Sequence, residues 1–342
     1  MIRSVPQLVS VAAICLGVLL FALTLSYIDL DETIESAARL GLALPIILLP
    51  GAAWHVLRTW GWAISFPETA RPAFTRLFRV RLAADAISFF TVRGLAGEPL
   101  KVLLLIDRSK PEITTAAIAL ERLAFAIMSI IIAGLISFFA VTQLTMPDAW
   151  DTVFTLLSIG AVVLLPVLAF IARRRREGDY LGRFVGMLDR LVGRRLEASR
   201  VVRFILDVED VLLELLRGDR RRLLILIGLP VLCYFIMVVE VWLVFWAIGE
   251  PIGFMEGLAV ETFTRLASVA SAAIPGNLGA LEASNAAVVS MLGLAGGGSL
   301  ALARRIRALL WAGLGLALYP QPRYRKPNAQ LAASNPRVPP VR

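Results

Sequence analysis

The chain has 342 residues, of which 58% are hydrophobic and 18% are charged. This composition argues against a water-soluble protein, and recurring apolar runs of eighteen or more residues are typical of a polytopic α-helical membrane protein. Arginines clustered between the apolar runs explain the net charge of +9, so we expect no nucleic-acid partner. Two cysteines in apolar runs and a single histidine predict neither a disulfide nor a histidine-based metal site, and we expect no cofactor.

Two apolar segments open the chain. The first, residues 8–27, is too long for a signal-peptide core and is predicted to be a retained span. An acidic loop follows, and a second span is predicted over residues 40–65. We expect His55, within this second span, to be packed or interfacial rather than catalytic.

A basic stretch, residues 71–81, is predicted to be a cytoplasmic loop before an apolar segment at residues 82–106. That apolar segment is either a full span or a hairpin that enters and leaves the membrane on one side. A full span would place the arginine-rich segment after residue 172 outside, against the positive-inside rule. The hairpin is therefore preferred.

The middle of the chain contains two spans and a basic segment. Residues 113–141 and 152–172 are predicted to cross the membrane. In residues 173–222, apolar positions at helical spacing predict amphipathic helices on the inner membrane face, touching anionic headgroups. A docking surface for a partner is the alternative for this segment.

The remaining chain contains a second broken segment. A span is predicted over residues 223–248, and residues 254–296 form two weakly hydrophobic halves around a break at residues 275–279. These halves are a hairpin entering from outside or two thin spans. The last span is predicted over residues 299–319, and the basic, proline-rich tail at 321–342 is predicted to be disordered and cytoplasmic.

The predicted fold is an all-α polytopic membrane protein with about six full spans and two opposed re-entrant hairpins. Residues 1–320 would form one transmembrane domain that includes the cytoplasmic segment 173–222. Charge placement predicts that both termini lie in the cytoplasm. We expect the membrane to be a bacterial-type inner membrane.

Two stretches resemble each other, which predicts an inverted repeat. Arg265–Glu282 reads RLASVASAAIPGNLGALE, and Arg81–Glu98 reads RLAADAISFFTVRGLAGE. Both begin Arg-Leu-Ala and both close on a glutamate seventeen positions later. Broken helices at matching positions of two halves are typical of transporters with a site at the repeat interface.

Glycines interrupt both stretches, and a proline also interrupts the second. Non-helical backbone at membrane depth survives only where protein or a water-filled cavity pairs its polar groups. The predicted hinge residues are Gly94, Gly97, Pro275, Gly276 and Gly279.

Charged residues at membrane depth are the candidate ligands for a headgroup, because each costs about 2.5–3.5 kcal/mol to insert. Glu261 precedes Arg265 by four residues, as in a helical ion pair, and Arg304 and Arg307 share one helical face. Guanidinium groups facing a cavity match phosphate geometry. The full set of transport candidates is Arg93, Glu98, Lys101, Glu121, Arg122, Glu261, Arg265, Asn277, Glu282, Arg304 and Arg307.

A purely structural role, in which these charges only cross-link helices, is the alternative for any single residue. It explains the whole set less well, because helix packing in lipid relies on small residues. The sequence contains no GxxxxGK, GxSxG or HExxH motif, so neither an enzyme nor a catalytic residue is predicted.

Three short motifs carry a family resemblance. GEPLK at residues 97–101, ERL at 121–123 and IPGNLG at 274–279, with Glu282, resemble the motifs of the lysylphosphatidylglycerol synthase transmembrane-region family. This flippase-like family includes hopanoid-associated members, and the likeness extends to about residue 320. Lys101 stands where the family more often has arginine, and Asn277 where glycine is frequent.

The resemblance implies a lipid flippase. Because the chain ends in a short tail, with no soluble domain to bind aminoacyl-tRNA, lipid aminoacylation is not expected. The leading hypothesis is a transporter that binds or translocates an anionic or phosphate-bearing lipid across the inner membrane. The alternative is a non-transporting accessory protein that holds a lipid- or glycan-synthesis enzyme, so the expected partners are membrane lipids and such an enzyme.

Overall fold

The computed structural model describes residues 40–91, 96–145, 147–174, 200–217, 219–271 and 280–320, together with Ala38 and Asn277. Across these residues the regular secondary structure is helical, and none of them lies in a strand. The all-α prediction is therefore confirmed for this part of the chain.

Long helices occupy the predicted spans that the structure describes. They are α3 (Leu44–Ile64), α6 (Pro111–Gln143), α7 (Asp148–Arg174), α10 (Arg220–Ala247) and α13 (Gly297–Ala317). Among the described helices, α6 and α10 are long and apolar enough to cross a membrane by length and composition. The predicted first span, residues 8–27, and the tail at 321–342 lie outside the described residues.

Two pairs of shorter helices occupy the predicted hairpins. Helix α4 (Phe74–Phe90) packs against α5 (Gly97–Leu105), and α11 (Phe254–Ala270) packs against α12 (Ala280–Met291). Short 3-10 turns, η1 (Gly41–Ala43) and η2 (Glu68–Ala70), lie at the two ends of α3.

The prediction of a loop at residues 71–81 is wrong for most of this range, because α4 begins at Phe74. Leu77 and Val80 recur at helical spacing and are fully buried, so this basic stretch has an apolar face that covers the core. The prediction considered only the charges, and Arg81 is itself buried within the helix.

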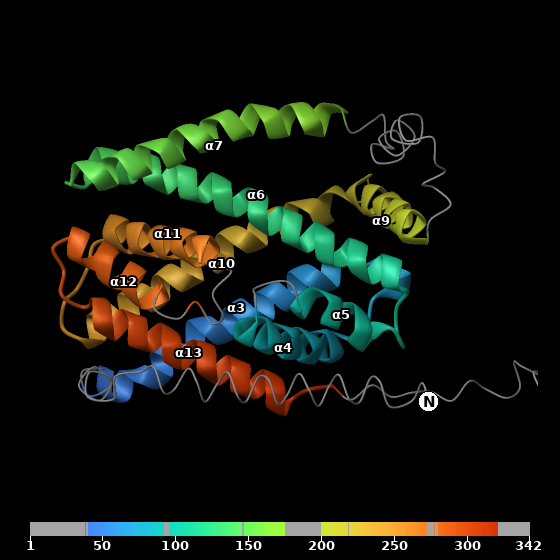
Figure 1. Ribbon diagram of the computed structural model, residues 1–342, viewed down its shortest axis with the longest axis horizontal. Coiled ribbons are helices and arrows are strands. Elements are labelled where there is room, and N and C mark those ends of the chain that lie inside the picture. The colour runs from blue at the N-terminus through green and yellow to red at the C-terminus, as the bar shows by residue number, and fades with distance from the viewer. Residues whose placement is uncertain are drawn as a thin grey trace, which may run out of the picture.

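The two halves of the chain repeat the same element order, α3–α4–α5–α6 and α10–α11–α12–α13. Figure 1 shows that corresponding helices of the two halves run in opposite directions. The halves also interlock reciprocally: α3 packs on α10, while the first helix of each hairpin packs on the last helix of the other half (α4 on α13, α11 on α6). The stretches Arg81–Glu98 and Arg265–Glu282 fall on the matching hairpins of this arrangement.

Glycines allow two of these helix contacts. A Cβ atom on Gly315 of α13 would collide with the backbone carbonyl of Leu82 in α4. One on Gly97 would lie 2.7 Å from the carbonyl oxygen of Ala84, so Gly97 permits the close approach of α5 to α4. Close backbone approach through small residues is how helices pack where lipid supplies no hydrophobic drive.

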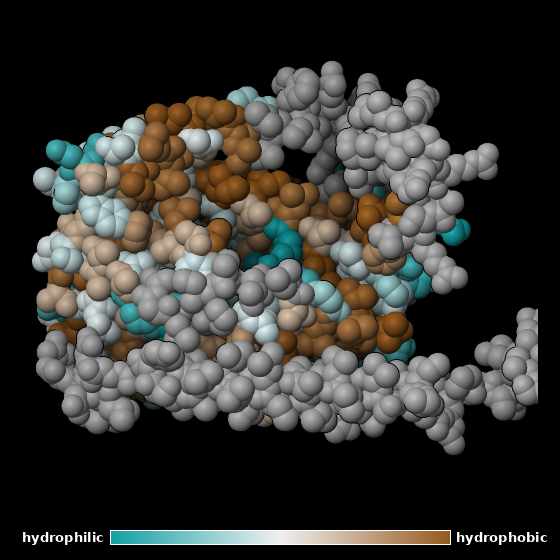
Figure 2. Space-filling model, in the orientation of Figure 1, coloured by the Kyte–Doolittle hydropathy of each residue, from teal (hydrophilic) through white to brown (hydrophobic). Residues whose placement is uncertain are grey.

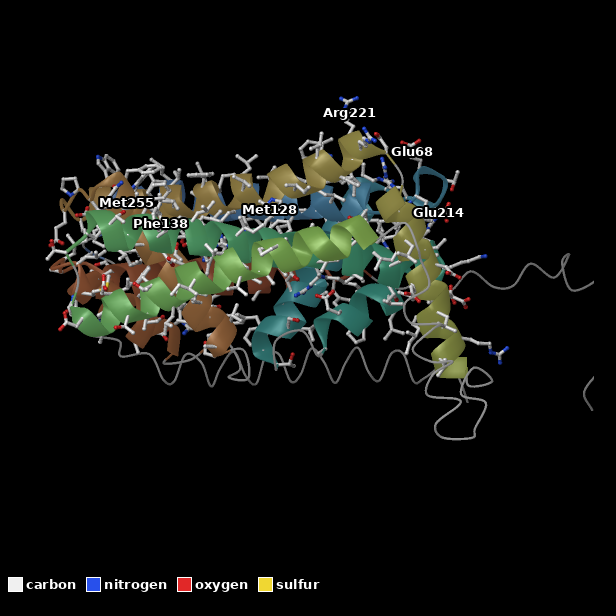
Figure 3. All side chains as sticks on the ribbon, turned by 90° about the horizontal axis from the view of Figure 1, so that it is seen from above. Glu68, Met128, Phe138, Glu214, Arg221 and Met255 are labelled. Carbon is white, nitrogen blue, oxygen red and sulfur yellow. The ribbon has the colours of Figure 1, made fainter. Side chains whose placement is uncertain are left out.

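The flanks of the bundle are apolar and its ends are charged. Exposed large hydrophobic residues, such as Leu135, Leu156 and Leu224, are spread over α6, α7 and α10 (Figure 2). Figure 3 shows Glu68, Glu214 and Arg221 at one end of the bundle, whereas Met128 and Phe138 lie along its length. An apolar flank between charged ends is the surface expected of a protein that sits in a bilayer.

Helix α9 (Arg200–Arg217) confirms an amphipathic helix in the basic segment, but its surroundings differ from the prediction. Its Leu215 is buried with Ala116 of α6, and α9 packs along α6. Its exposed positions include the basic Arg203 and the acidic Asp207, Asp210 and Glu214, so contact of this helix with anionic headgroups stays a prediction. Residues 175–199 lie outside the described residues.

Candidate functional site

A polar cavity of about 390 Å³ lies between the two halves. Side chains of α3, α4, α6, α10, α11 and α13 line it, and so does Asn277 ahead of α12. A hydrophilic area near the middle of the mostly hydrophobic face in Figure 2 contrasts with the apolar flanks. Six of the described arginines line the cavity, namely Arg58, Arg81, Arg122, Arg265, Arg304 and Arg307.

In the first half, a buried glutamate joins three helices. Glu121 of α6 is 2% exposed, and its Oε1 lies 2.9 Å from Arg58 Nε of α3. Arg58 Nη2 also donates to Glu121 Oε2 at 3.2 Å, and Arg81 Nη2 of α4 lies 3.4 Å from Oε1. The Arg58 guanidinium is 3.6 Å from the centre of the Phe125 ring, a cation–π contact. Removing one member of such a buried group would leave an uncompensated charge, which is strongly destabilising.

The first hairpin adds a second set of pairs to this site. Lys101 Nζ of α5 lies 3.6 Å from Asp85 Oδ1 of α4 and donates to Glu98 Oε1 at 3.1 Å. Glu98 also accepts from Arg122 of α6. These pairs tie both helices of the hairpin to α6, and Lys101 is nearly fully buried.

In the second half, Glu261 of α11 joins two arginines in a similar way. Arg265 Nε and Arg304 Nη2 each lie 2.6 Å from one of its carboxylate oxygens. Arg304 Nη1 donates to Asn285 Oδ1 at 2.9 Å, and Thr264 Oγ1 donates to the same oxygen at 3.1 Å. The predicted helical pair of Glu261 and Arg265 is confirmed, and Arg304 extends it across helices.

Arg307 and Glu240 make a further pair beside the cavity. Arg307 Nη1 of α13 donates to Glu240 Oε2 of α10 at 2.5 Å, and Glu240 is buried. Arg304 and Arg307 both line the cavity, as their shared helical face predicts.

Glu282 lies apart from these groups. It pairs with Arg305, whose Nε donates to Glu282 Oε1 at 2.9 Å, and neither residue lines the cavity. Arg305 follows Arg304 directly, and successive residues of a helix point about 100° apart. The two side chains therefore contact different parts of the protein.

Asn277 belongs to the cavity wall and adopts a left-handed backbone conformation, with φ of 51°. Its Nδ2 donates to Ser268 Oγ at 2.7 Å. Asparagine tolerates this conformation better than other non-glycine residues, so it can occupy a position where glycine is frequent. The other break candidates, Arg93, Gly94, Pro275, Gly276 and Gly279, lie outside the described residues.

Several residues of the site were missed at the sequence level, above all Arg58, Arg81 and Asp85. Arg58 lies within an apolar span, so the criterion of charge at membrane depth applies to it as it does to Glu121. Arg81 opens one of the two similar stretches. His55 is packed, as expected, between Trp54 and Trp311, with ring centres at 4.9 and 4.6 Å, and it also lines the cavity.

The chemistry of the site is that of an anion receptor. Guanidinium groups from opposed helices converge on one cavity, and such groups bind carboxylate and phosphate oxygens in pairs. Within the described ranges, no group of three or more His, Cys, Asp or Glu side chains is placed to hold a metal ion.

Comparison with known protein families shows a match. The sequence profile of the family described as "Lysylphosphatidylglycerol synthase TM region" matches residues 7–317. No curated protein and no solved structure matches the chain. The matched range includes both halves and the whole cavity.

Proposed function

Because the chain belongs to the lysylphosphatidylglycerol synthase transmembrane-region family, a membrane family related to lipid metabolism or transport, we propose that it is a lipid flippase. In this proposal it binds a lipid with an anionic or phosphate-bearing headgroup and moves it across the inner membrane. The acyl chains stay in the bilayer while the headgroup passes through the polar cavity.

The observation that carries this proposal is the arginine-lined cavity inside an apolar bundle. Buried arginines at membrane depth are costly, and they occur where they face a cavity or a partner. Here each half contributes three of the six lining arginines, so an anion between the halves would contact both. A role limited to cross-linking helices gives no reason for arginines to gather around a space.

The proposed topology places the hairpins in opposite leaflets. Figure 1 supports it, because α4–α5 and α11–α12 extend from opposite ends of the bundle toward its middle. The basic residues Arg220–Arg222 begin α10 at one end, and the acidic residues Asp148 and Asp151 begin α7 at the other. By the positive-inside rule the first end faces the cytoplasm.

The opposed halves also suggest how the cavity alternates between leaflets. In transporters with inverted repeats, one repeat rocks against the other around a fixed central site. Here the arginines belong to both halves and each pairs with a carboxylate. A headgroup that enters the cavity would therefore be shared between arginines that keep their carboxylate partners, because a displaced buried carboxylate would be left unpaired.

The test is lipid movement in liposomes that contain the purified full chain. An anionic lipid with a fluorescent label is reconstituted, and the labelled fraction in the outer leaflet is followed by chemical quenching. We expect the wild type to exchange lipid and Arg265→Gln to lose about tenfold in rate, since a hydrogen bond to a charged group contributes roughly 1.5–3 kcal/mol.

Glu68→Gln is the matched control, because Glu68 is exposed in η2 at one end of the bundle. It should move lipid at the wild-type rate. A wild-type protein that binds the lipid without moving it would favour the accessory-protein alternative. A protein that neither binds nor moves it would contradict the proposal.

A further inference from the structure

His55 and Asp85 face each other across a short gap in the cavity wall. His55 of α3 is 8% exposed, and its Nδ1 lies 4.0 Å from Oδ2 of Asp85 in α4. Both atoms are buried, neither has a hydrogen-bond partner among the described residues, and both side chains line the cavity. Buried polar atoms in native proteins are nearly always paired, so two opposed atoms without a partner indicate that this gap closes in another state of the protein.

The geometry of the pair fits a shared proton. A hydrogen bond between nitrogen and oxygen measures about 2.7–3.2 Å, so the two side chains need to approach by only about 1 Å. The ring of His55 is held between those of Trp54 and Trp311, with ring centres at 4.9 and 4.6 Å. An imidazolium donates from both of its nitrogens, so a protonated His55 always has an Nδ1–H group to give to Asp85.

Asp85 is able to accept this hydrogen bond. Its Oδ1 lies 3.6 Å from Lys101 Nζ and its Oδ2 lies 3.5 Å from Arg81 Nε, so both cations act on it at ion-pair distance. An ionised carboxylate has about four acceptor positions, and Oδ2 makes no hydrogen bond within the described part of the chain. Asp85 is therefore a carboxylate that is held by charge and open toward the imidazole.

The other charges around His55 connect it to the proposed anion site. Among the described residues they are Arg58 of its own helix, Arg81 of α4 and Arg307 of α13. Arg58 pairs with Glu121 of α6, and Arg307 pairs with Glu240 of α10. All three arginines line the same cavity as His55, so an anion that they bind also favours the protonated imidazole. Because coupling between two sites is reciprocal, a proton on His55 in turn favours binding of the anion.

We infer that His55, facing Asp85, binds a proton when the headgroup enters the cavity, so that lipid and proton cross the membrane together. This inference rests on the proposed function and adds the ion that drives it. Histidine is the side chain whose charge ordinarily changes between pH 5 and 8, and Asp, Glu and His residues at membrane depth are typical of proton pathways. The proton comes from water on one side, adds to the unprotonated imidazole nitrogen and returns to water on the other side as the lipid leaves. One proton balances one negative charge of the headgroup, so this transfer moves no net charge.

Proteoliposomes that contain the purified full chain test the coupling. The probe is phosphatidylglycerol with a fluorescent acyl chain, present as a trace, and an impermeant quencher reports the fraction in each leaflet. With about pH 6 outside and about pH 8 inside, one proton per lipid can sustain up to about a hundredfold ratio between the leaflets, because each pH unit corresponds to a factor of about ten. We expect at least about tenfold enrichment in the inner leaflet, reached faster than in protein-free liposomes under the same gradient. A membrane voltage without a pH gradient should give no enrichment.

Two outcomes separate this inference from the function on which it rests. Lipid movement that ends at equal leaflet populations despite the pH gradient would overturn proton coupling and leave the proposed flippase standing. A protein that moves no lipid at all would defeat the proposed function and the coupling with it.

Substitutions at the pair locate the proton. His55→Gln keeps a polar side chain that cannot carry a proton, and it should lower the enrichment to about twofold or less. Asp85→Asn should do the same, but it also weakens the ion pairs of Asp85, so His55→Gln is the principal variant. Asp107→Asn is the matched control and should keep the full enrichment, because Asp107 pairs with Arg76 and does not line the cavity. Wild-type enrichment in His55→Gln would overturn the assignment of the proton to this residue.

Proton uptake on binding gives a readout that does not depend on transport. A pH indicator in weakly buffered detergent solution follows the protons taken up when phosphatidylglycerol is added to the protein. At about pH 7 we expect uptake of about half a proton or more per protein in the wild type and in Asp107→Asn, and at most about a tenth of that in His55→Gln. Equal uptake by the wild type and His55→Gln would place the proton elsewhere and overturn the inference.

Discussion

The two halves of the molecule use the same ionic device in different surroundings. In each half, one buried glutamate joins two arginines: Glu121 joins Arg58 and Arg81, and Glu261 joins Arg265 and Arg304. In the first half, both arginine side chains are at most 11% exposed. In the second half, the side chain of Arg265 is 28% exposed.

This difference separates a structural role from a ligand-binding role. Arg58 meets Glu121 through two nitrogens and also stacks on Phe125, so its charge is fully used inside the protein. Arg265 lines the cavity and meets Glu261 through Nε, and its guanidinium lies 4.5 Å from the centre of the ring of the buried Tyr234. We infer that the first network holds the helices together, while the second can also bind a ligand through Arg265.

The largest effect should come from Glu121→Gln. It leaves the buried Arg58 without its carboxylate partner and Arg81 with Asp85 alone, and breaking a buried pair costs roughly 3–5 kcal/mol. We expect a large loss of unfolding free energy, measured by denaturant titration of the detergent-purified protein. Glu68→Gln at the exposed end should leave stability unchanged. If Glu121→Gln also left the unfolding free energy unchanged, the distinction between the two networks would be lost.

The hairpins differ in the residue at one matching position, a glycine in the first hairpin, and Gly97→Ala tests its role. Because a Cβ at this position would press on the Ala84 carbonyl, overpacking should cost about 1–3 kcal/mol of stability. The matching position of the second hairpin is Leu281, which lines the cavity. Gly228→Ala is the control, since a Cβ there meets nothing within 4 Å, and thermal unfolding of the two variants should differ clearly.

A double-mutant cycle compares the two partners of Glu261. We expect a coupling free energy of about 2 kcal/mol with the buried Arg304 and about 0.5 kcal/mol with the partly exposed Arg265, because solvent screens the latter. The measurement is the unfolding free energy of Glu261→Gln, of Arg304→Gln, of Arg265→Gln and of the two double variants that combine Glu261→Gln with one arginine substitution. Equal couplings would show that exposure does not distinguish the two arginines.

Glu282→Gln should have a smaller effect on transport than Arg265→Gln does. The Glu282 side chain is 41% exposed and pairs with Arg305 away from the cavity, so its loss should leave the fold intact and lower the liposome rate by about twofold at most. A variant as slow as Arg265→Gln would return Glu282 to the headgroup path.

The two ends of the bundle are predicted to face opposite sides of the membrane, and a topology measurement tests this. The tags should change neither stability nor transport. Reporter tags at residue 178 and residue 342 should both be accessible from the cytoplasm, because arginines concentrate near the first of these sites and in the tail. Tags on opposite sides would reject the orientation proposed here.

The sequence by itself determined the class of the protein, the position of its helices and several local pairs. Apolar runs longer than a membrane is thick predict membrane helices, and the pair Glu261–Arg265 follows from helical periodicity alone. The repeat of Arg81–Glu98 in Arg265–Glu282 also indicated which segments correspond. These signals are local, because each is read from neighbours along one helix or from the order of residues.

Only the tertiary structure decided which charges share a partner. Glu121 meets Arg58 and Arg81, which lie 63 and 40 positions away along the chain, and Arg305 turns to Glu282 while Arg304 turns to Glu261. Desolvation requires that a buried charge find a partner, but it does not name one. The partner is set by which helices cross, and those crossings depend on close contacts such as that of Gly315 with Leu82.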